Sequence, residues 1–104
     1  MKLVSEHKTN RFKLLLALYI ASDADTDFSI NMEQLAEQRQ IDFKKMEKSL
    51  RYLLDEHFAE MKDGGGELQA AITHKGIKVV EEVFLDAKKQ TYYFPPYQEM
   101  RKKD

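Results

Sequence analysis

The sequence contains no cysteine and no tryptophan, and only two prolines and four glycines in 104 residues. Without cysteine there is no disulfide framework, no thiolate nucleophile and no cysteine-ligated zinc, which fits a reducing compartment. No apolar run reaches the roughly 18–20 residues that a bilayer span requires, and residues 1–10 lack the apolar core of a signal peptide. We therefore expect a cytoplasmic protein that has no membrane partner.

Net charge is also nearly absent, because 17 Lys and Arg are balanced by 18 Asp and Glu. Any binding of a polyanion would therefore depend on a local patch of cations. A hydrophobic share of 42% is enough for one core, and a chain this short is expected to form one domain of modest stability.

The first helix is expected to begin at a cap on Thr9 or Asn10 and to run to Ala21. Apolar residues occur on nearly every side of it, which indicates a helix buried on more than one face. Residues 1–8 would then form an N-terminal arm. Turn formers follow at 22–27, and residues 28–30 alternate in the manner of a very short strand.

Two further helices are marked by their caps. Asn31 is an N-cap residue with Gln34 three positions on, and the short helix that follows should end near Arg39. Asp42 is expected to cap a third helix that reaches His57. The apolar positions of this third helix fall within an arc of about 100°. They are Phe43, Met46, Leu50, Leu53 and Leu54.

A hairpin and a fourth helix complete the chain. Glycines 64–66 separate two short, roughly alternating segments, which is a hairpin signal. Thr73 is the expected N-cap of the fourth helix, and the prolines at 95 and 96 end any helical continuation. Residues 91–104 form an aromatic and charged tail. The apolar stripe of the fourth helix comprises Ile77, Val80, Val83, Phe84 and Ala87.

This order of elements resembles the winged helix-turn-helix domain, and the resemblance covers residues 9–90. Residues 38–42 stand where that family has a tight turn before its recognition helix. Residues 72–76 are similar to the Leu-Thr-x-x-Gly segment that leaves the wing in many bacterial and archaeal regulators. The resemblance implies an α+β, mostly helical fold with a three-helix core, a two-stranded wing and a C-terminal helix.

The resemblance also implies that residues 43–57 form the recognition helix of a small prokaryotic transcriptional regulator, which binds duplex DNA sequence-specifically in the major groove. Lysine and arginine neutralise phosphates, and arginine donates two hydrogen bonds to guanine. The same cations also occur on the solvated face of any amphipathic helix. The residues assigned to DNA are Lys44, Lys45, Lys48, Ser49, Arg51 and Tyr52, with Arg39 in the preceding turn.

The hairpin departs from the family pattern. Many winged-helix regulators carry arginine or lysine at the wing tip, whereas here Asp63 and Glu67 flank the glycines. The alternative function is therefore a winged-helix adaptor that does not bind DNA and docks protein partners through its acidic wing or its tail.

The tail concentrates aromatic side chains around two prolines, and such side chains need an apolar surface to pack on. Two interpretations stay open. The tail either folds back over its own domain and covers the first helix, or it builds a homodimer together with the fourth helix. The residues of this dimer or partner interface would be Val80, Phe84, Tyr92, Tyr93, Phe94 and Tyr97.

Catalytic and metal-binding constellations are missing. Residues 23–30 imitate the start of a calcium-binding EF-hand loop, but Phe28 stands where glycine is needed and Gln34 where a bidentate carboxylate is needed. The three histidines have no metal-ligand spacing, and no serine lies in a nucleophile motif. We expect no enzyme, no metal or cofactor, and no assignable small-molecule effector.

Overall fold

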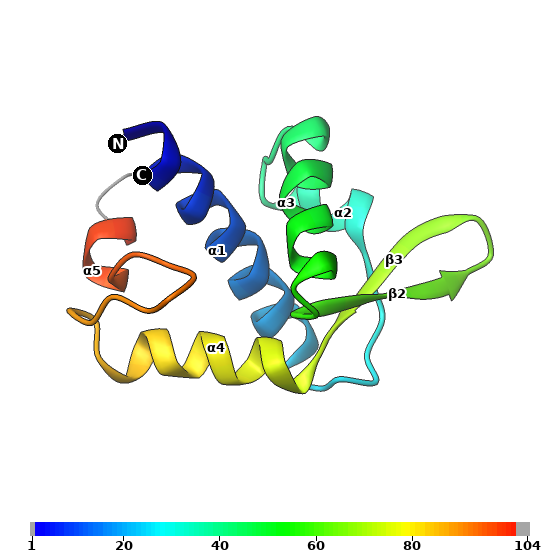
Figure 1. Cartoon of the computed structure of the whole chain (residues 1–104). Coiled ribbons are helices and arrows are strands. Elements are labelled where there is room, and N and C mark those ends of the chain that lie inside the picture. Colours follow the sequence, from blue (N-terminus) through cyan, green and yellow to red (C-terminus); the bar gives the residue numbers. More distant parts are fainter. Residues whose placement is uncertain (1, 102–104) are drawn as a thin grey trace.

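The computed structural model describes residues 2–101, and this part of the chain forms five helices and a three-stranded sheet (Figure 1). Met1 of the predicted arm and residues 102–104 of the predicted tail lie outside the described residues. The elements, in chain order, are α1 (Lys2–Ser22), β1 (Ile30–Asn31), α2 (Met32–Gln38), α3 (Phe43–Asp55), β2 (Ala59–Gly64), β3 (Glu67–Ile72), α4 (His74–Leu85) and α5 (Tyr97–Met100).

Helix α1 begins earlier than the sequence predicts. It starts at Lys2, so the expected cap at Thr9 or Asn10 is wrong, and residues 2–8 form its first turns instead of an arm. No glycine or proline interrupts this segment, and the Thr9 side chain is buried. Packing of the segment therefore outweighs the weak preference of threonine and asparagine for a helix start.

The predicted caps of α2, α3 and α4 are confirmed. The side chain of Asn31 accepts a hydrogen bond from the backbone N–H of Gln34 at 3.0 Å, and that of Asp42 accepts one from Lys45 at 3.2 Å. Thr73 accepts a hydrogen bond from the N–H of Gly76 at 3.1 Å. Each bond satisfies a backbone donor that has no partner within the helix.

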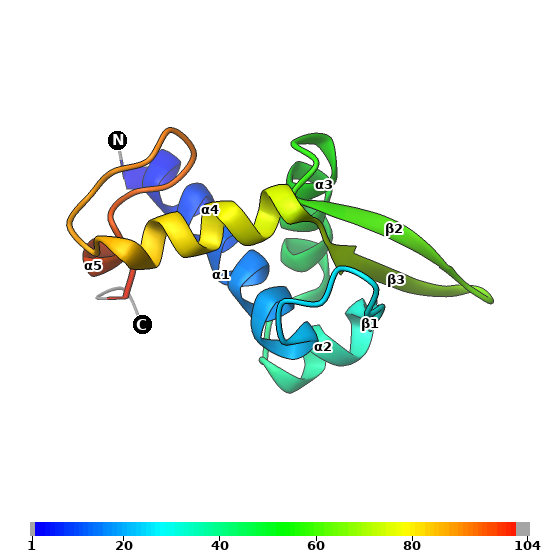
Figure 2. The ribbon, with the colours of Figure 1, turned by 90° about the horizontal axis from the view of Figure 1, so that it is seen from below.

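The predicted hairpin forms between β2 and β3. Gly65 and Gly66 have φ values of 65° and 95°, which suit the two-residue loop of a tight hairpin. Strand β3 is central, because β1 pairs with its other edge and places Ile30 opposite Ala70. The hairpin projects from the helices at one end of the molecule (Figures 1 and 2).

Helix α1 is central to the core, as its apolar residues on many sides indicate. It contacts α3, α4, β1 and β3, and Phe12, Leu15 and Leu18 are almost completely buried. Helix α4 crosses α1 on one side and α3 packs on another (Figures 1 and 2). The position of α3 is therefore set largely by α1.

Helix α4 ends sooner than its apolar stripe suggests. It stops at Leu85, so Ala87 lies beyond the helix and is exposed. The Asp86 side chain accepts a hydrogen bond from the N–H of Lys88 at 3.0 Å, and the Asp86 carbonyl accepts one from Lys89 at 3.1 Å. This local turn competes with another helical turn.

The tail folds back over its own domain, which decides between the two interpretations of the tail. Phe94 is fully buried, with its ring centroid 5.2 Å from that of Phe12 on α1 and 6.2 Å from that of Phe58. Tyr97 packs on Phe84 of α4, with centroids 4.5 Å apart. The tail is thus part of the core.

This packing corrects the predicted interface. Val80 and Phe94 are fully buried within the chain, so neither lies on a surface that a partner can reach. Tyr93 and Tyr97 are half-buried against the rings of their own domain. Phe84 and Tyr92 alone among the six predicted residues are exposed, at 43% and 88%.

Replacing Phe94 with alanine tests the structural role of the tail. Because the side chain is fully buried against other rings, we expect Phe94→Ala to lower the free energy of unfolding by about 3–5 kcal/mol, measured by denaturant titration. Tyr92→Ala is the control, since its exposed side chain should change that free energy by only about 0.5 kcal/mol. Equal effects of the two substitutions would contradict a tail that packs within its own domain.

Candidate nucleic-acid interface

Helix α3 has one apolar face and one basic face, as its periodicity predicts. Met46, Leu50 and Leu53 are buried against the rest of the domain. The side chains of Lys44, Lys48 and Arg51 are exposed, and so is that of Lys45 nearer to α1. We call Lys44, Lys48 and Arg51 the basic face of α3.

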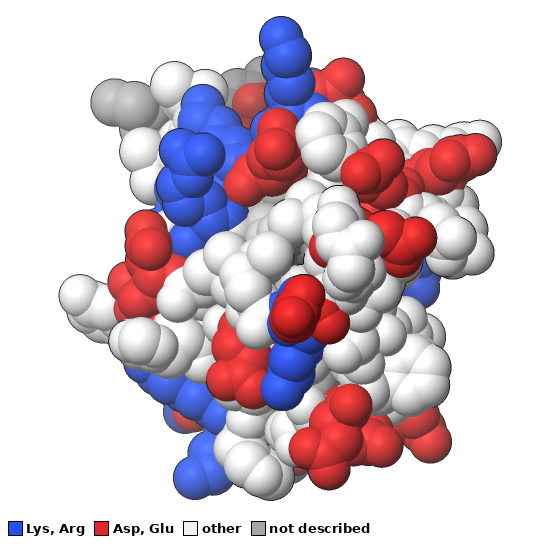
Figure 3. Space-filling model, turned by 90° about the vertical axis from the view of Figure 1, so that its right-hand side faces the viewer, with Lys and Arg blue, Asp and Glu red and all other residues white. Residues whose placement is uncertain are grey.

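The cations of the basic face form no ion pair within the part of the chain that the structure describes. Among residues 2–101, no ion pair joins Lys44, Lys48 or Arg51 to an aspartate or glutamate. Seen from the wing end, basic side chains gather in the upper part of the molecule, where α3 lies, and acidic ones lie beside and below them (Figure 3). The positive surface is therefore local.

The exposure of Ser49 and that of Phe43 are opposite to the prediction. Ser49 is 8% exposed, so it does not face outward, because it lies on the side of α3 that meets α1. Phe43, expected in the core, is 42% exposed at the first position of the helix.

His57, expected as the last residue of the third helix, lies beyond its end at Asp55 and is exposed. It has a φ of 62°, and the following N–H, of Phe58, donates to the carbonyl of Leu53 at 2.9 Å. This is the usual left-handed ending of a helix, with histidine in the position that glycine commonly takes.

Tyr52 stacks on a cation of α1 instead of standing free. The guanidinium carbon of Arg11 lies 4.0 Å from the centroid of the Tyr52 ring. Burial raises the pKa of the Tyr52 phenol and the charge of Glu56 raises it further, whereas the charge of Arg11 lowers it. Arg11 and Tyr52 therefore connect α1 to α3 beside the basic face.

A groove separates the N-terminal half of α1 from α3. Lys45, Lys48 and Ser49 of α3 line one wall of a cavity of about 300 Å³, and α1 supplies the other wall. The structure thus brings these predicted residues together with side chains that were not predicted. The residues of α1 in this wall are Leu3, Glu6, His7, Asn10 and Arg11.

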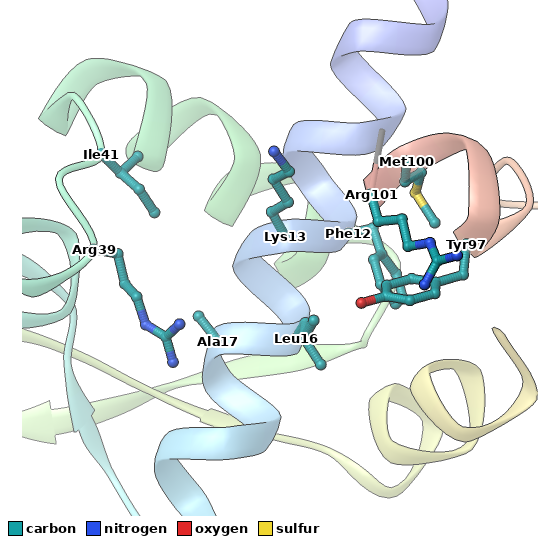
Figure 4. A pocket seen from close by; sticks show the side chains of 9 residues that line it. All are labelled: Phe12, Lys13, Leu16, Ala17, Arg39, Ile41, Tyr97, Met100 and Arg101. Atoms are coloured by element: carbon teal, nitrogen blue, oxygen red, sulfur yellow. The ribbon is translucent and has the colours of Figure 1, made fainter. Parts of the chain in front are cut away.

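Arg39 lies in a different cavity. It lines a space of about 340 Å³ between α1, the turn after α2 and α5, together with Lys13 and Arg101 (Figure 4). Phe12 and Tyr97 contribute aromatic surface to the same cavity. Arg39 is exposed there and is separate from the cavity that Lys48 lines.

The wing contributes little positive charge to the surface. Lys62 pairs with Glu60 at 2.9 Å. Glu67 accepts hydrogen bonds from the side-chain amides of Asn31 at 3.1 Å and Gln69 at 3.3 Å, which hold its carboxylate beside β1. With Asp63 also exposed, the outer part of the wing is acidic, as its sequence indicates.

The prediction of an arm at residues 1–8 misses the contribution of Leu3, Glu6 and His7 to this surface. The sequence signal for a longer helix was present, since residues 2–22 contain no glycine or proline.

Within the described residues no group of three or more histidines and carboxylates is placed to hold a metal ion. None of the described helices is both long and apolar enough to cross a membrane.

The fold is shared with a solved structure. A cysteine-to-serine mutant of MarR from E. coli, complexed with operator DNA, matches this chain with a TM-score of 0.60 at 17% sequence identity. The match covers 78% of this chain and 60% of that chain, so this chain spans about three fifths of its length. No protein-family model and no curated protein matches the sequence. The predicted winged helix-turn-helix fold is thus confirmed.

Substitutions around Tyr52 test the contact between α1 and α3. Arg11→Met keeps an unbranched side chain beside the ring and removes the charge that lowers the Tyr52 pKa, so we expect that pKa to rise. Glu56→Gln removes a charge that raises it and should lower it. Both shifts are measured by following the Tyr52 ring signals in an NMR titration between about pH 8 and 12. Shifts of the same sign in both variants would contradict this geometry.

Proposed function

We propose that this winged-helix chain binds duplex DNA and acts as a transcriptional regulator, with α3 in the major groove. The observation that carries the proposal is the basic face of α3, whose three cations are exposed and joined to no carboxylate among the described residues. A helix that presents such a face on a rigid core can lie in the major groove and bring its side chains to base edges.

The three cations would have different roles. Lys44 and Lys48 are one helical turn apart, so both can meet phosphates along one strand. Arg51 continues the same face, and its guanidinium can donate two hydrogen bonds to a guanine. Arg51 would therefore supply much of the sequence specificity, whereas the lysines would supply affinity and register.

The solved relative supports this proposal, because that protein is complexed with operator DNA. The proposal leaves out two of the predicted DNA contacts, those of Ser49 and Tyr52. Ser49 is buried and Tyr52 is stacked on Arg11, so we assign them to the support of α3. Lys45 stays in the proposal as a phosphate contact at the edge nearest α1.

An adaptor without DNA binding is the second candidate. The acidic outer part of the wing favours it, because Glu60, Asp63 and Glu67 would meet the phosphates of any duplex that the wing approached. Such a surface suits a basic protein partner. The two functions differ in whether the chain binds duplex DNA with an affinity that falls as the salt concentration rises.

The salt dependence of binding tests the DNA interface. Each phosphate contact made by a lysine adds to the fall of log K with log salt, so Lys44→Ala combined with Lys48→Ala should reduce that slope by about 1–2 units. Fluorescence anisotropy with a labelled duplex at several salt concentrations measures this slope. Lys78→Ala with Lys88→Ala, which removes two exposed cations of the α4 region, should leave the slope unchanged. No detectable duplex affinity at low salt would favour the adaptor.

We also propose that the chain forms a homodimer, through a surface different from the predicted one. The N-terminal end of α1 and the C-terminal end of α4 lie at the end of the molecule opposite the wing (Figures 1 and 2). Large apolar side chains are exposed there: Leu3 at 57%, Val4 at 48% and Leu85 at 88%. Two copies joined there would keep both α3 helices free for successive major grooves.

Sedimentation of point variants tests this dimer, since truncating the tail would remove Phe94 from the core. At micromolar concentration the wild-type chain should sediment at twice its 12.2 kDa mass. Val4→Asp with Leu85→Asp should sediment as a monomer, because each charge would be buried in the interface. Ile20→Asp, at an exposed apolar position elsewhere on α1, should stay dimeric. A monomeric wild-type chain would exclude the dimer.

A further inference from the structure

A second, smaller cavity lies in the groove between α1 and α3, next to the one that Lys48 lines. It measures about 270 Å³ and is bounded by five side chains, four from one face of α1 and one from α3. Lys45, Asn10 and Glu6 also belong to the neighbouring cavity, so the two are continuous. The five residues are Glu6, Thr9, Asn10, Lys13 and Lys45.

Thr9 is the unusual residue of this cavity. Its side chain is only 3% exposed, and its hydroxyl oxygen has no hydrogen-bond partner in the described part of the chain. A buried hydroxyl without a partner is destabilising by about 1–3 kcal/mol, so native structures seldom retain one without a reason. In helices threonine divides between two χ1 rotamers, and rotation about this bond can turn the hydroxyl toward the cavity.

The other side chains of the cavity suit an anion. Lys13 lines the cavity from α1 and Lys45 from α3, and the Asn10 amide is a neutral donor. Glu6 is the one carboxylate in the lining. The Lys45 ammonium, the Asn10 amide and a hydroxyl are donors for the oxygens of a tetrahedral anion.

From this geometry we propose that the cavity binds a phosphate group, held by Lys45 and Asn10 and by the Thr9 hydroxyl after rotation about χ1. In the complex with DNA the phosphate belongs to the backbone of one strand. The cavity lies beside Lys48, and a strand whose bases meet the basic face of α3 would carry its phosphates along this flank. This part of the inference rests on the proposed function, whereas a free phosphate ion could bind without it.

Thr9→Val separates the effect on binding from the effect on folding. The substitution replaces an unpartnered hydroxyl with a methyl group of similar size, so we expect the variant to unfold at the same denaturant concentration as the wild type or a higher one. Its affinity for duplex DNA should fall about tenfold, as expected for one lost hydrogen bond to a charged group, with an unchanged salt slope. Thr26→Val, in the loop after α1, is the matched control and should bind DNA as the wild type does.

Lys45→Gln is the second variant, and it keeps the test decisive if Thr9→Val does not fold. Because it removes a charge, it should weaken binding and also reduce the salt slope by about one unit. An NMR titration of the full chain with inorganic phosphate, compared with chloride at equal ionic strength, should show saturable shifts of the Thr9, Asn10 and Lys45 amides for phosphate alone. Both variants should weaken these shifts.

The outcomes distinguish this inference from the proposed function. If substitution of Lys44 and Lys48 abolishes duplex binding while Thr9→Val and Lys45→Gln leave it unchanged, the phosphate cavity is overturned and the DNA interface stands. If no duplex binds but inorganic phosphate gives the saturable shifts, the cavity is supported with a free ion as its source, and the DNA function fails. Identical responses to phosphate and chloride would overturn the cavity.

Discussion

Burial of α1 on several sides is the constraint on which the rest of the structure depends. This helix contacts α3, α4, β1 and β3, and its buried residues Phe12, Leu15 and Leu18 hold these elements around one core. Because the position of α3 is set by α1, the direction of the basic face is set by apolar packing elsewhere in the domain. The Arg11–Tyr52 stack adds a polar connection at the edge of the same contact.

The charge distribution shows how a nearly neutral chain can present a basic surface. The formal net charge is −1, yet the fold places Lys44, Lys48 and Arg51 on one helix face and leaves carboxylates on the wing. The wing is formed by antiparallel pairing of β2 with β3, and it projects away from the helices (Figure 1). Binding at such a surface would be local and sensitive to salt.

The two ends of the molecule have different chemistry. At one end lie the wing and α3, with charged side chains, and at the other lie the start of α1, the end of α4 and the tail (Figure 1). The tail fills part of the core, because Phe94 inserts between Phe12 and Phe58. The apolar residues that stay exposed there, such as Leu85, are left over after the core is complete.

The local features of this protein could be predicted from its sequence, because they depend on neighbours within four residues. The caps at Asn31, Asp42 and Thr73, the glycine turn of the wing and the periodicity of α3 are of this kind. The burial of Ser49 and Phe94 could not, since each depends on contacts between segments distant in the chain. Short-range hydrogen bonds and turn geometry are encoded in adjacent residues, whereas the tertiary structure alone decides which of several apolar or polar faces finds a partner.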